Sequence, residues 1–169
     1  MRLQVGRSGH LPVLLLTAVF IAVLLWVSVL WAGAGEPVKP GPKDKCPVCG
    51  MFVHKYTDFL AQVVFKDGSV AFFDGAKDMF KYYLDVQKFD RKHRQSDIGA
   101  VYVTDYYSLT LVDGFKAVYI AGSDVYGPMG KELIPFEKES EGRGFLKDHK
   151  GKRLLRFQDV NPSILKGLD

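Results

Sequence analysis

The sequence has only two cysteines, Cys46 and Cys49, among its 169 residues. Two cysteines cannot build a disulfide framework, and they cannot complete an all-cysteine zinc site. The chain also lacks an activated serine motif, a phosphate-binding glycine loop and paired carboxylates in an apolar setting. These absences argue against an enzyme, and we expect a protein that binds rather than catalyses.

Most of the chain also lacks a strong excess of positive or negative charge. The net charge is +4, from 23 basic and 19 acidic residues. Residues 1–35 hold Arg2 and Arg7 and no acid, which leaves 21 basic and 19 acidic residues, a net charge of +2, in 36–169. A domain so close to neutral has no long-range field to gather nucleic acid, which is therefore not an expected partner.

The one long hydrophobic run lies at 11–31, LPVLLLTAVFIAVLLWVSVLW, and it holds no charge, Asn, Gln or Gly. A helix of this length covers roughly the 30 Å hydrocarbon core of a bilayer. The small residues at 32–34 leave a cleaved signal peptide as the alternative, but the run exceeds the usual signal core of about 7–15 residues. We therefore predict an uncleaved anchor. No cysteine directly follows the run, so the sequence has no site for a lipid anchor there.

The remaining chain divides by composition. We expect a short tail at 1–10, the anchor at 11–31, a stiff proline-rich tether at 32–45 and a single exported domain at 46–169. Some 135 residues suffice for one hydrophobic core. Apolar and turn patterns predict strands at 59–65, 70–73, 100–104, 115–121, 133–136 and 153–157, and helices at 76–84 and 139–149.

This order indicates an α+β fold built as ββαβ twice. Lys66–Ser69 is typical of a hairpin turn, and Asp74 is placed to cap the helix that starts at 76. The segment 122–130 is expected to be a glycine-rich loop.

The sulfur-containing residues form the most informative pattern. Cys46 and Cys49 sit two residues apart beside Gly50, which allows the backbone to fold back so that both sulfurs point at one ion. Thiolate and thioether are soft ligands that select Cu(I) over hard divalent ions. Met51 offers a third sulfur, and Met129, between a proline and a glycine, a fourth. His54 is a possible nitrogen donor.

Three other interpretations stay open from these residues alone. The cysteine pair can form a disulfide, so that the domain is a membrane-tethered adaptor. It can be a thiol-redox pair, although CPVC here follows a proline-rich segment and does not open a helix after a strand, as a thioredoxin-type motif does. It can hold zinc, which needs two more ligands, and His54, His93 and His149 lack zinc-finger spacing.

The motifs CPVCGM, FFDGAKDMFKYY, VYVTDY, GSDVYGPMG, ELIPF and FLKDHKGKRLLRF resemble the NosL family over about residues 44–160. NosL proteins are copper-binding accessory proteins of nitrous oxide reductase. The resemblance implies two ββαβ repeats, similar to a domain of organomercurial lyase, and it carries the ligands over as Cys46, Cys49, Met51 and Met129. An organomercurial-cleaving activity rests on that fold analogy alone.

The same resemblance implies a periplasmic Cu(I) metallochaperone that acts in denitrification. It would deliver copper to an exported enzyme, nitrous oxide reductase, beside an ABC-type maturation complex. Many members of the family carry a lipidated cysteine, which this chain lacks. The apolar helix at 11–31 would replace the lipid, as a single-pass anchor in the inner membrane.

Overall fold

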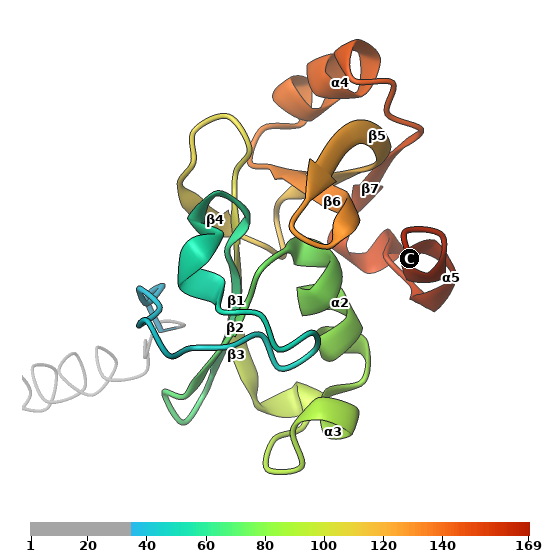
Figure 1. Cartoon of the computed structure of the whole chain (residues 1–169). Helices are drawn as coiled ribbons and strands as arrows, with labels where there is room; N and C mark the ends of the chain where they lie inside the picture. Colours follow the sequence, from blue (N-terminus) through green and yellow to red (C-terminus); the bar gives the residue numbers. More distant parts are fainter. Residues whose placement is uncertain (1–34) are drawn as a thin grey trace, which may run out of the picture. The chain divides into compact units, whose positions relative to one another are not determined.

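The computed structural model describes residues 35–169, and the predicted tail and anchor at 1–31 lie outside that range. Within it, no helix is both long and apolar enough to cross a membrane. The described chain forms two antiparallel sheets with helices packed against them (Figure 1).

The first sheet has the strand order β2-β1-β3-β4. Its strands are β1 (Ala61–Phe65), β2 (Val70–Phe73), β3 (Ile98–Thr104) and β4 (Leu111–Asp113). The hairpin turn at Lys66–Ser69 and the helix α2 (Ala76–Leu84) are confirmed. The strand predicted from residue 59 begins at Ala61, because Thr57–Phe59 forms the 3-10 turn η3.

The second sheet has the order β6-β5-β7, from β5 (Val118–Gly127), β6 (Gly130–Phe136) and β7 (Arg153–Arg156). The helix α4 (Glu139–Asp148) lies between β6 and β7 in the chain, as predicted. The prediction of a glycine-rich loop at 122–130 is wrong. Strand β5 continues through an irregularity between Ala121 and Tyr126 and turns back directly into β6. Glycines supply bulge and turn conformations here without ending the pairing.

Shorter elements fill the connections. They are η2 (Val53–Lys55), α3 (Val86–Phe89), η4 (Gln95–Asp97), η5 (Phe157–Asp159) and α5 (Pro162–Lys166). Neither the short strand β4 nor α5 is predicted by the sequence pattern, since each is shorter than the windows in which periodicity can be recognised.

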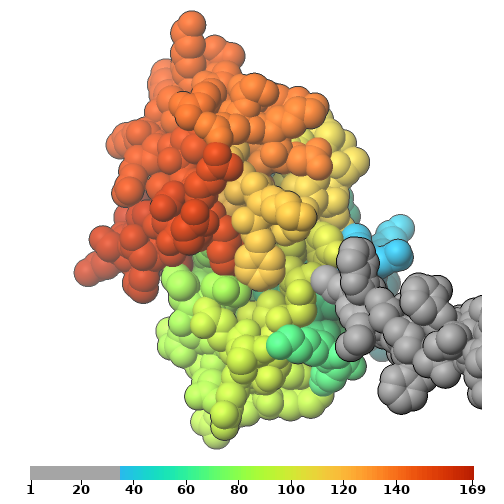
Figure 2. Space-filling view, turned by 180° about the vertical axis from the view of Figure 1, so that it is seen from behind, coloured from blue at the N-terminus to red at the C-terminus, as the bar shows by residue number. Residues whose placement is uncertain are grey.

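The prediction of a mixed α+β fold is confirmed. Each sheet places the first strand of its half in the centre, flanked by the next strand and by the strand that follows the helix. That the two halves are repeats of one unit stays a prediction. Seen from behind, the green first half and the orange and red second half lie against each other, with the yellow segment between them (Figure 2).

The main core lies where α2 packs between the halves. Helix α2 contributes Met79, Phe80 and Tyr82, each at most 1% exposed, whereas Tyr83 is only half-buried. Tyr119 from β5 joins this core, and Phe80 meets its ring edge-on with the ring centres 4.9 Å apart. Burial of each such side chain stabilises the fold by about 1.5–3 kcal/mol. A smaller cluster between α4 and the second sheet comprises Val118, Ile120, Ile134, Phe136 and Phe145.

The start of α2 differs from the expectation. Gly75 is the N-cap residue, and no side chain caps the helix from that position, so the predicted cap by Asp74 is wrong. Instead Glu132 on β6 accepts a hydrogen bond from the backbone N–H of Lys77 at 2.5 Å and from that of Leu133 at 2.8 Å. Burial raises the pKa of Glu132 to about 7, although these two N–H groups and the Lys77 charge lower it. A carboxylate from the second half thus satisfies a free N–H of the first-half helix.

The part of the predicted stiff tether that the structure describes, from residue 35, is in contact with the domain. The buried Gln62 side chain exchanges two hydrogen bonds with the Val38 backbone, at 2.8 and 3.1 Å. The Tyr102 hydroxyl donates to the Gly35 carbonyl at 3.1 Å, and Pro40 is buried. From residue 35 onwards, this segment is therefore held along β1 and β3.

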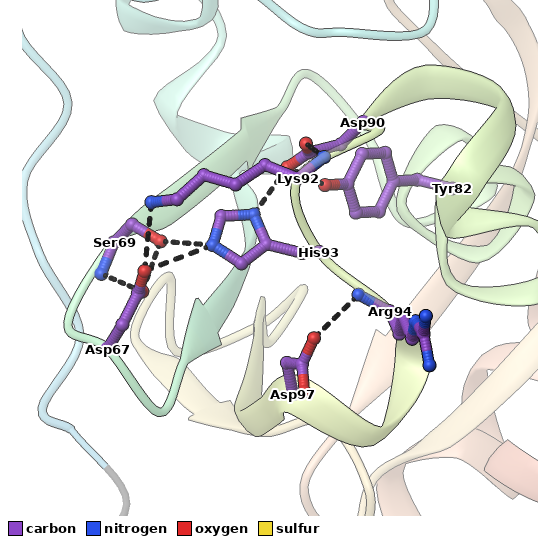
Figure 3. Close-up of polar contacts among 8 residues, drawn as sticks. All are labelled: Asp67, Ser69, Tyr82, Asp90, Lys92, His93, Arg94 and Asp97. Carbon is purple, nitrogen blue, oxygen red and sulfur yellow. Dashed lines mark hydrogen bonds and ion pairs between the residues drawn. The ribbon is translucent and has the colours of Figure 1, made fainter.

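A polar cluster joins the β1–β2 turn to the loop after α3 (Figure 3). His93 lies 2.6 Å from Asp90 through Nδ1, and its Nε2 lies 3.1 Å from Asp67 and 3.2 Å from Ser69 Oγ. Its ring stacks on Phe65, with the ring centres 3.9 Å apart.

Although this cluster holds a serine, a histidine and an aspartate, it does not have the hydrogen-bond pattern of a catalytic triad. The hydrogen bond to Asp90, with a further one to Asp67, raises the pKa of His93. The Ser69 hydroxyl donates to Asp67 at 2.5 Å, whereas the serine of a triad donates to the imidazole. The contacts of His93 and Ser69 with Asp67 and Asp90 link the two loops.

The contact between Gly75 and Glu132 gives a stability prediction. A methyl group on Gly75 would overlap the Glu132 carboxylate, which is fixed by two N–H groups. We expect Gly75→Ala to lower the free energy of unfolding by about 1–3 kcal/mol in urea denaturation.

Gly144→Ala is the matched control, because Gly144 lies within α4 and a methyl group there meets no atom within 4 Å. This substitution should raise the free energy of unfolding by up to about 1 kcal/mol. Equal effects of the two substitutions would contradict the predicted clash at Gly75.

Candidate metal centre

Cys46 and Cys49 lie in a tight loop that closes on itself. The Cys46 N–H donates to the Met51 carbonyl at 2.9 Å, and the Gly50 N–H donates to the Cys46 carbonyl at 2.8 Å. Gly50 has a φ of 81°, in the left-handed region that glycine adopts without strain. The role predicted for Gly50, a backbone that folds back beside the two cysteines, is confirmed.

Two carboxylates at the beginning of α2 complete the cluster. Asp78 lies in the first turn of α2, and Asp74 lies just before the N-cap residue Gly75. The Cys49 thiol donates to Asp74 Oδ1 at 3.1 Å, and the Cys46 thiol lies 3.5 Å from Asp78 Oδ2. Ligand atoms of all four residues lie within 4.8 Å of one another, close enough to bind one ion.

The cluster is more enclosed on the Cys46 side than on the Cys49 side. Cys46 is 1% exposed, whereas Cys49 is half-buried. Both carboxylates are buried, and Lys81 Nζ lies 3.7 Å from Asp78 Oδ1. The lysine offsets part of the negative charge that burial makes costly.

Burial keeps the thiols protonated. It raises the pKa of Cys49 to about 11, with the Met51 N–H acting to lower it and the hydrogen bond to Asp74 acting to raise it. Burial also raises the pKa of Cys46, against the N–H groups of Cys49 and Val48. At neutral pH both thiols therefore hold their protons and donate toward the carboxylates. A metal that binds here must displace those protons.

This donor set fits a metal ion that accepts sulfur. Two thiolates suit Cu(I), and a set of two cysteines and two carboxylates is also one that Zn²⁺ accepts. Both cysteines are free thiols. The structure therefore does not favour the interpretation of the pair as a disulfide.

The other two sulfur candidates differ in exposure. Met51 is half-buried in the cysteine loop, and Met129 is 45% exposed at the turn between β5 and β6. The Met129 carbonyl accepts a hydrogen bond from the buried Lys77 Nζ at 2.9 Å, which fixes this turn beside the residue that precedes Asp78. The thioethers of Met51 and Met129 stay predicted ligands.

The histidines are not part of the four-residue group. His54 lies in η2, and its Nδ1 is buried without a hydrogen-bond partner among the described residues. His93 is bound between Asp67 and Asp90, and His149 Nδ1 lies 3.1 Å from Asp124.

Sequence reasoning did not find Asp74 and Asp78. Asp74 was assigned to the helix cap, and Asp78 was given no role. The available signal was two acids four residues apart around the start of the helix, where carboxylates are common without any metal. Only the fold shows that this turn faces the cysteine loop, 25 and 32 residues away in the chain.

The fold and the site together define a small α+β domain with a dithiol and dicarboxylate centre. The NosL family model matches residues 37–165. The chain is 29% identical over 133 residues to the copper-binding lipoprotein NosL of Stutzerimonas stutzeri. The aligned residues make up 78% of this chain and 69% of that protein. The crystal structure of the copper chaperone NosL from Shewanella denitrificans matches with a TM-score of 0.63 and 21% identity, over 76% of this chain and 97% of that one. The chain belongs to the NosL family.

The contact between Cys49 and Asp74 can be tested through thiol reactivity. Because the carboxylate opposes the thiolate, Asp74→Asn should lower the pKa of Cys49 from about 11, with burial still holding it above the ordinary value. The measurement is the pH profile of alkylation by iodoacetamide, with peptide mass spectrometry to assign the modification to Cys49.

Asp124→Asn removes an exposed acid that pairs with His149 and Lys150 and should leave the profile unchanged. An unshifted Cys49 profile in Asp74→Asn would show that the carboxylate does not act on this thiol.

Proposed function

We propose that the chain is a Cu(I)-binding metallochaperone, not an enzyme, and that Cys46 and Cys49 are the principal ligands of its cargo. The observation that carries this proposal is the convergence of two free thiols and two buried carboxylates in one cluster. Membership of the NosL family, which includes a protein named as copper-binding, supports copper as the metal.

Charge decides how the four groups divide their roles. A Cu(I) ion with two thiolates has a net charge of −1, and two ionised carboxylates would bring the buried site to −3. Such a concentration of charge is unfavourable away from water. Carboxylate oxygen is also a hard ligand that suits Cu(I) poorly. We therefore assign Asp74 and Asp78 to accept the protons that Cys49 and Cys46 lose when copper enters.

The difference in exposure between the thiols sets the direction of transfer. Cys46 is buried, so it holds the ion on the enclosed side of the site, while the half-buried Cys49 holds it on the more accessible side. An incoming ligand from a client approaches on the Cys49 side. Cu(I) accepts low coordination numbers, so the new ligand can bind before the chaperone ligands leave.

Met51 and Met129 complete the proposed site. Met51 follows Cys49 within the same loop, and Met129 is presented by the turn that Lys77 holds. An exposed thioether is a weak ligand that is easily displaced. Met129 is therefore the first ligand to release the ion.

We further propose the setting of this function. A membrane anchor at 11–31 would place residues 46–169 in the periplasm, on the outer side of the inner membrane. The client would be an exported copper enzyme, for which nitrous oxide reductase is the first choice, and delivery would occur beside an ABC-type maturation complex. The two ββαβ halves would be structural repeats. These points rest on the apolar run at 11–31 and on the family.

The thiols are the first target of a test. Cys46→Ser combined with Cys49→Ser should abolish stoichiometric Cu(I) binding, measured anaerobically by competition with a chromogenic Cu(I) chelator. Unchanged affinity in this double variant would refute the proposed site. If the purified protein contains zinc, and neither Cu(I) nor a complex of Cu(I) with the chelator displaces it, the cluster is a structural zinc site instead.

A second test asks whether Met129, and not just any methionine of the chain, is a copper ligand. Met129→Leu should weaken Cu(I) binding roughly tenfold, which corresponds to about 1.4 kcal/mol, and should speed transfer to the chelator. Met79→Leu is the control, because Met79 is fully buried in the core and offers no sulfur to the site. Equal affinities of the two variants would remove Met129 from the ligand set.

A further inference from the structure

A second concave site lies in the other half of the domain, with a volume of about 260 Å³. It opens where β5 leaves its regular pairing: Ala121 is the last residue of β5 that faces both Leu133 on β6 and Arg153 on β7. The C-terminal helix α5 forms the opposite wall with Ser163 and Ile164. None of the residues of the cysteine and carboxylate cluster lines this pocket.

The charged side chains that line the pocket are all basic: Lys131, Lys152 and Arg153. Within residues 35–169, none of these three cations forms an ion pair with an acidic side chain. Other lysines of the described chain differ, since Lys81 pairs with Asp169 and Lys150 with Asp124. Three unneutralised cations around one hollow concentrate positive potential there, even though the domain as a whole is close to neutral.

The backbone places Lys152 at the pocket. Gly122 has a φ of 77°, and the aliphatic part of Lys152 lies over it, where a methyl group would meet Lys152 Cγ and Cδ at 3.0 Å. The Lys152 N–H donates to the Ala121 carbonyl at 2.9 Å. The bulge in β5 thus makes room for the lysine side chain and holds its base.

The lining specifies the chemistry of a ligand. Three positive charges exceed what a single carboxylate needs, and they match a phosphate monoester, which carries about −1.5 to −2 charges at neutral pH. Ser163 adds a hydroxyl group as a hydrogen-bond donor, and Ile164 offers a small apolar surface. The volume lies below the roughly 300–1,000 Å³ of sites for drug-sized ligands. A small organic phosphate therefore fits these features.

We propose that this pocket binds the phosphate group of a small phosphate ester. The phosphate can belong to a soluble monoester or to the headgroup of an anionic phospholipid, which present the same chemistry to the three cations. The site is independent of the metal centre, and binding is expected equally in the Cys46→Ser, Cys49→Ser variant.

The test uses the full chain in micelles of an uncharged maltoside detergent, titrated with glycerol 3-phosphate by isothermal calorimetry. We expect saturable binding of one ligand per chain. Lys131→Gln, Lys152→Gln and Arg153→Gln together should weaken it at least about tenfold, because charge-assisted hydrogen bonds are lost. Exchange of these residues for the other basic type, in Lys131→Arg, Lys152→Arg and Arg153→Lys, should retain binding.

The matched control removes the same charge elsewhere, through Lys43→Gln, Arg91→Gln and Lys147→Gln, three exposed basic residues outside the pocket. Its affinity for glycerol 3-phosphate should equal that of the unsubstituted chain. Equal weakening by the pocket and control sets would overturn the proposal, as would the absence of saturable binding.

The two sources of phosphate are distinguished by repeating the titration in micelles that contain phosphatidic acid. If the lipid headgroup occupies the pocket, glycerol 3-phosphate must compete, and its apparent affinity falls in the unsubstituted chain. If the pocket takes only soluble esters, the added lipid leaves the titration unchanged. Either result supports a phosphate site, and only the first makes it a lipid site.

Discussion

The first turn of α2 is surrounded by three buried carboxylates, and the rest of the domain is arranged so that each of them has a partner. Asp74 and Asp78 receive the thiols of the cysteine loop, and Glu132 receives a backbone N–H of the helix itself. An unpaired buried carboxylate is costly, so these contacts hold three distant segments together. The cysteine loop, the helix and strand β6 therefore depend on one another for their positions.

This constraint links the candidate metal centre, which lies in the first half of the chain, to the second half. Lys77 is next to Asp78, and its side chain holds the Met129 turn through a carbonyl while its backbone bonds to Glu132. A movement of the β5–β6 hairpin would therefore act directly on the turn that carries the carboxylates. The centre is assembled from local pieces, yet its geometry is controlled by tertiary contacts.

The sequence was a good guide wherever chemistry and structure are local. The helix 76–84 was predicted with the observed bounds, because apolar residues recur at helical spacing along it. The cysteine pair was recognised because both thiols lie in one turn. Asp74 was misassigned for the opposite reason. In the sequence, an aspartate that caps a helix cannot be distinguished from one that accepts a hydrogen bond from a thiol, and only the fold brings Cys49, 25 residues away, against Asp74. Strand β5 was cut short because the glycines at 122 and 127 looked like the end of pairing, whereas they form a bulge and a hairpin within it.

The hydrogen bonds between Val38 and Gln62 have a mechanical consequence. Any pull that reaches the domain along the chain from residues before 35 is transmitted first to the two bonds at Gln62 and to the hydroxyl of Tyr102, and only then to Cys46. Because Gln62 is fully buried in the central strand β1, the load passes into the sheet. These contacts therefore bear a force applied at residue 35 before it reaches the cysteine loop.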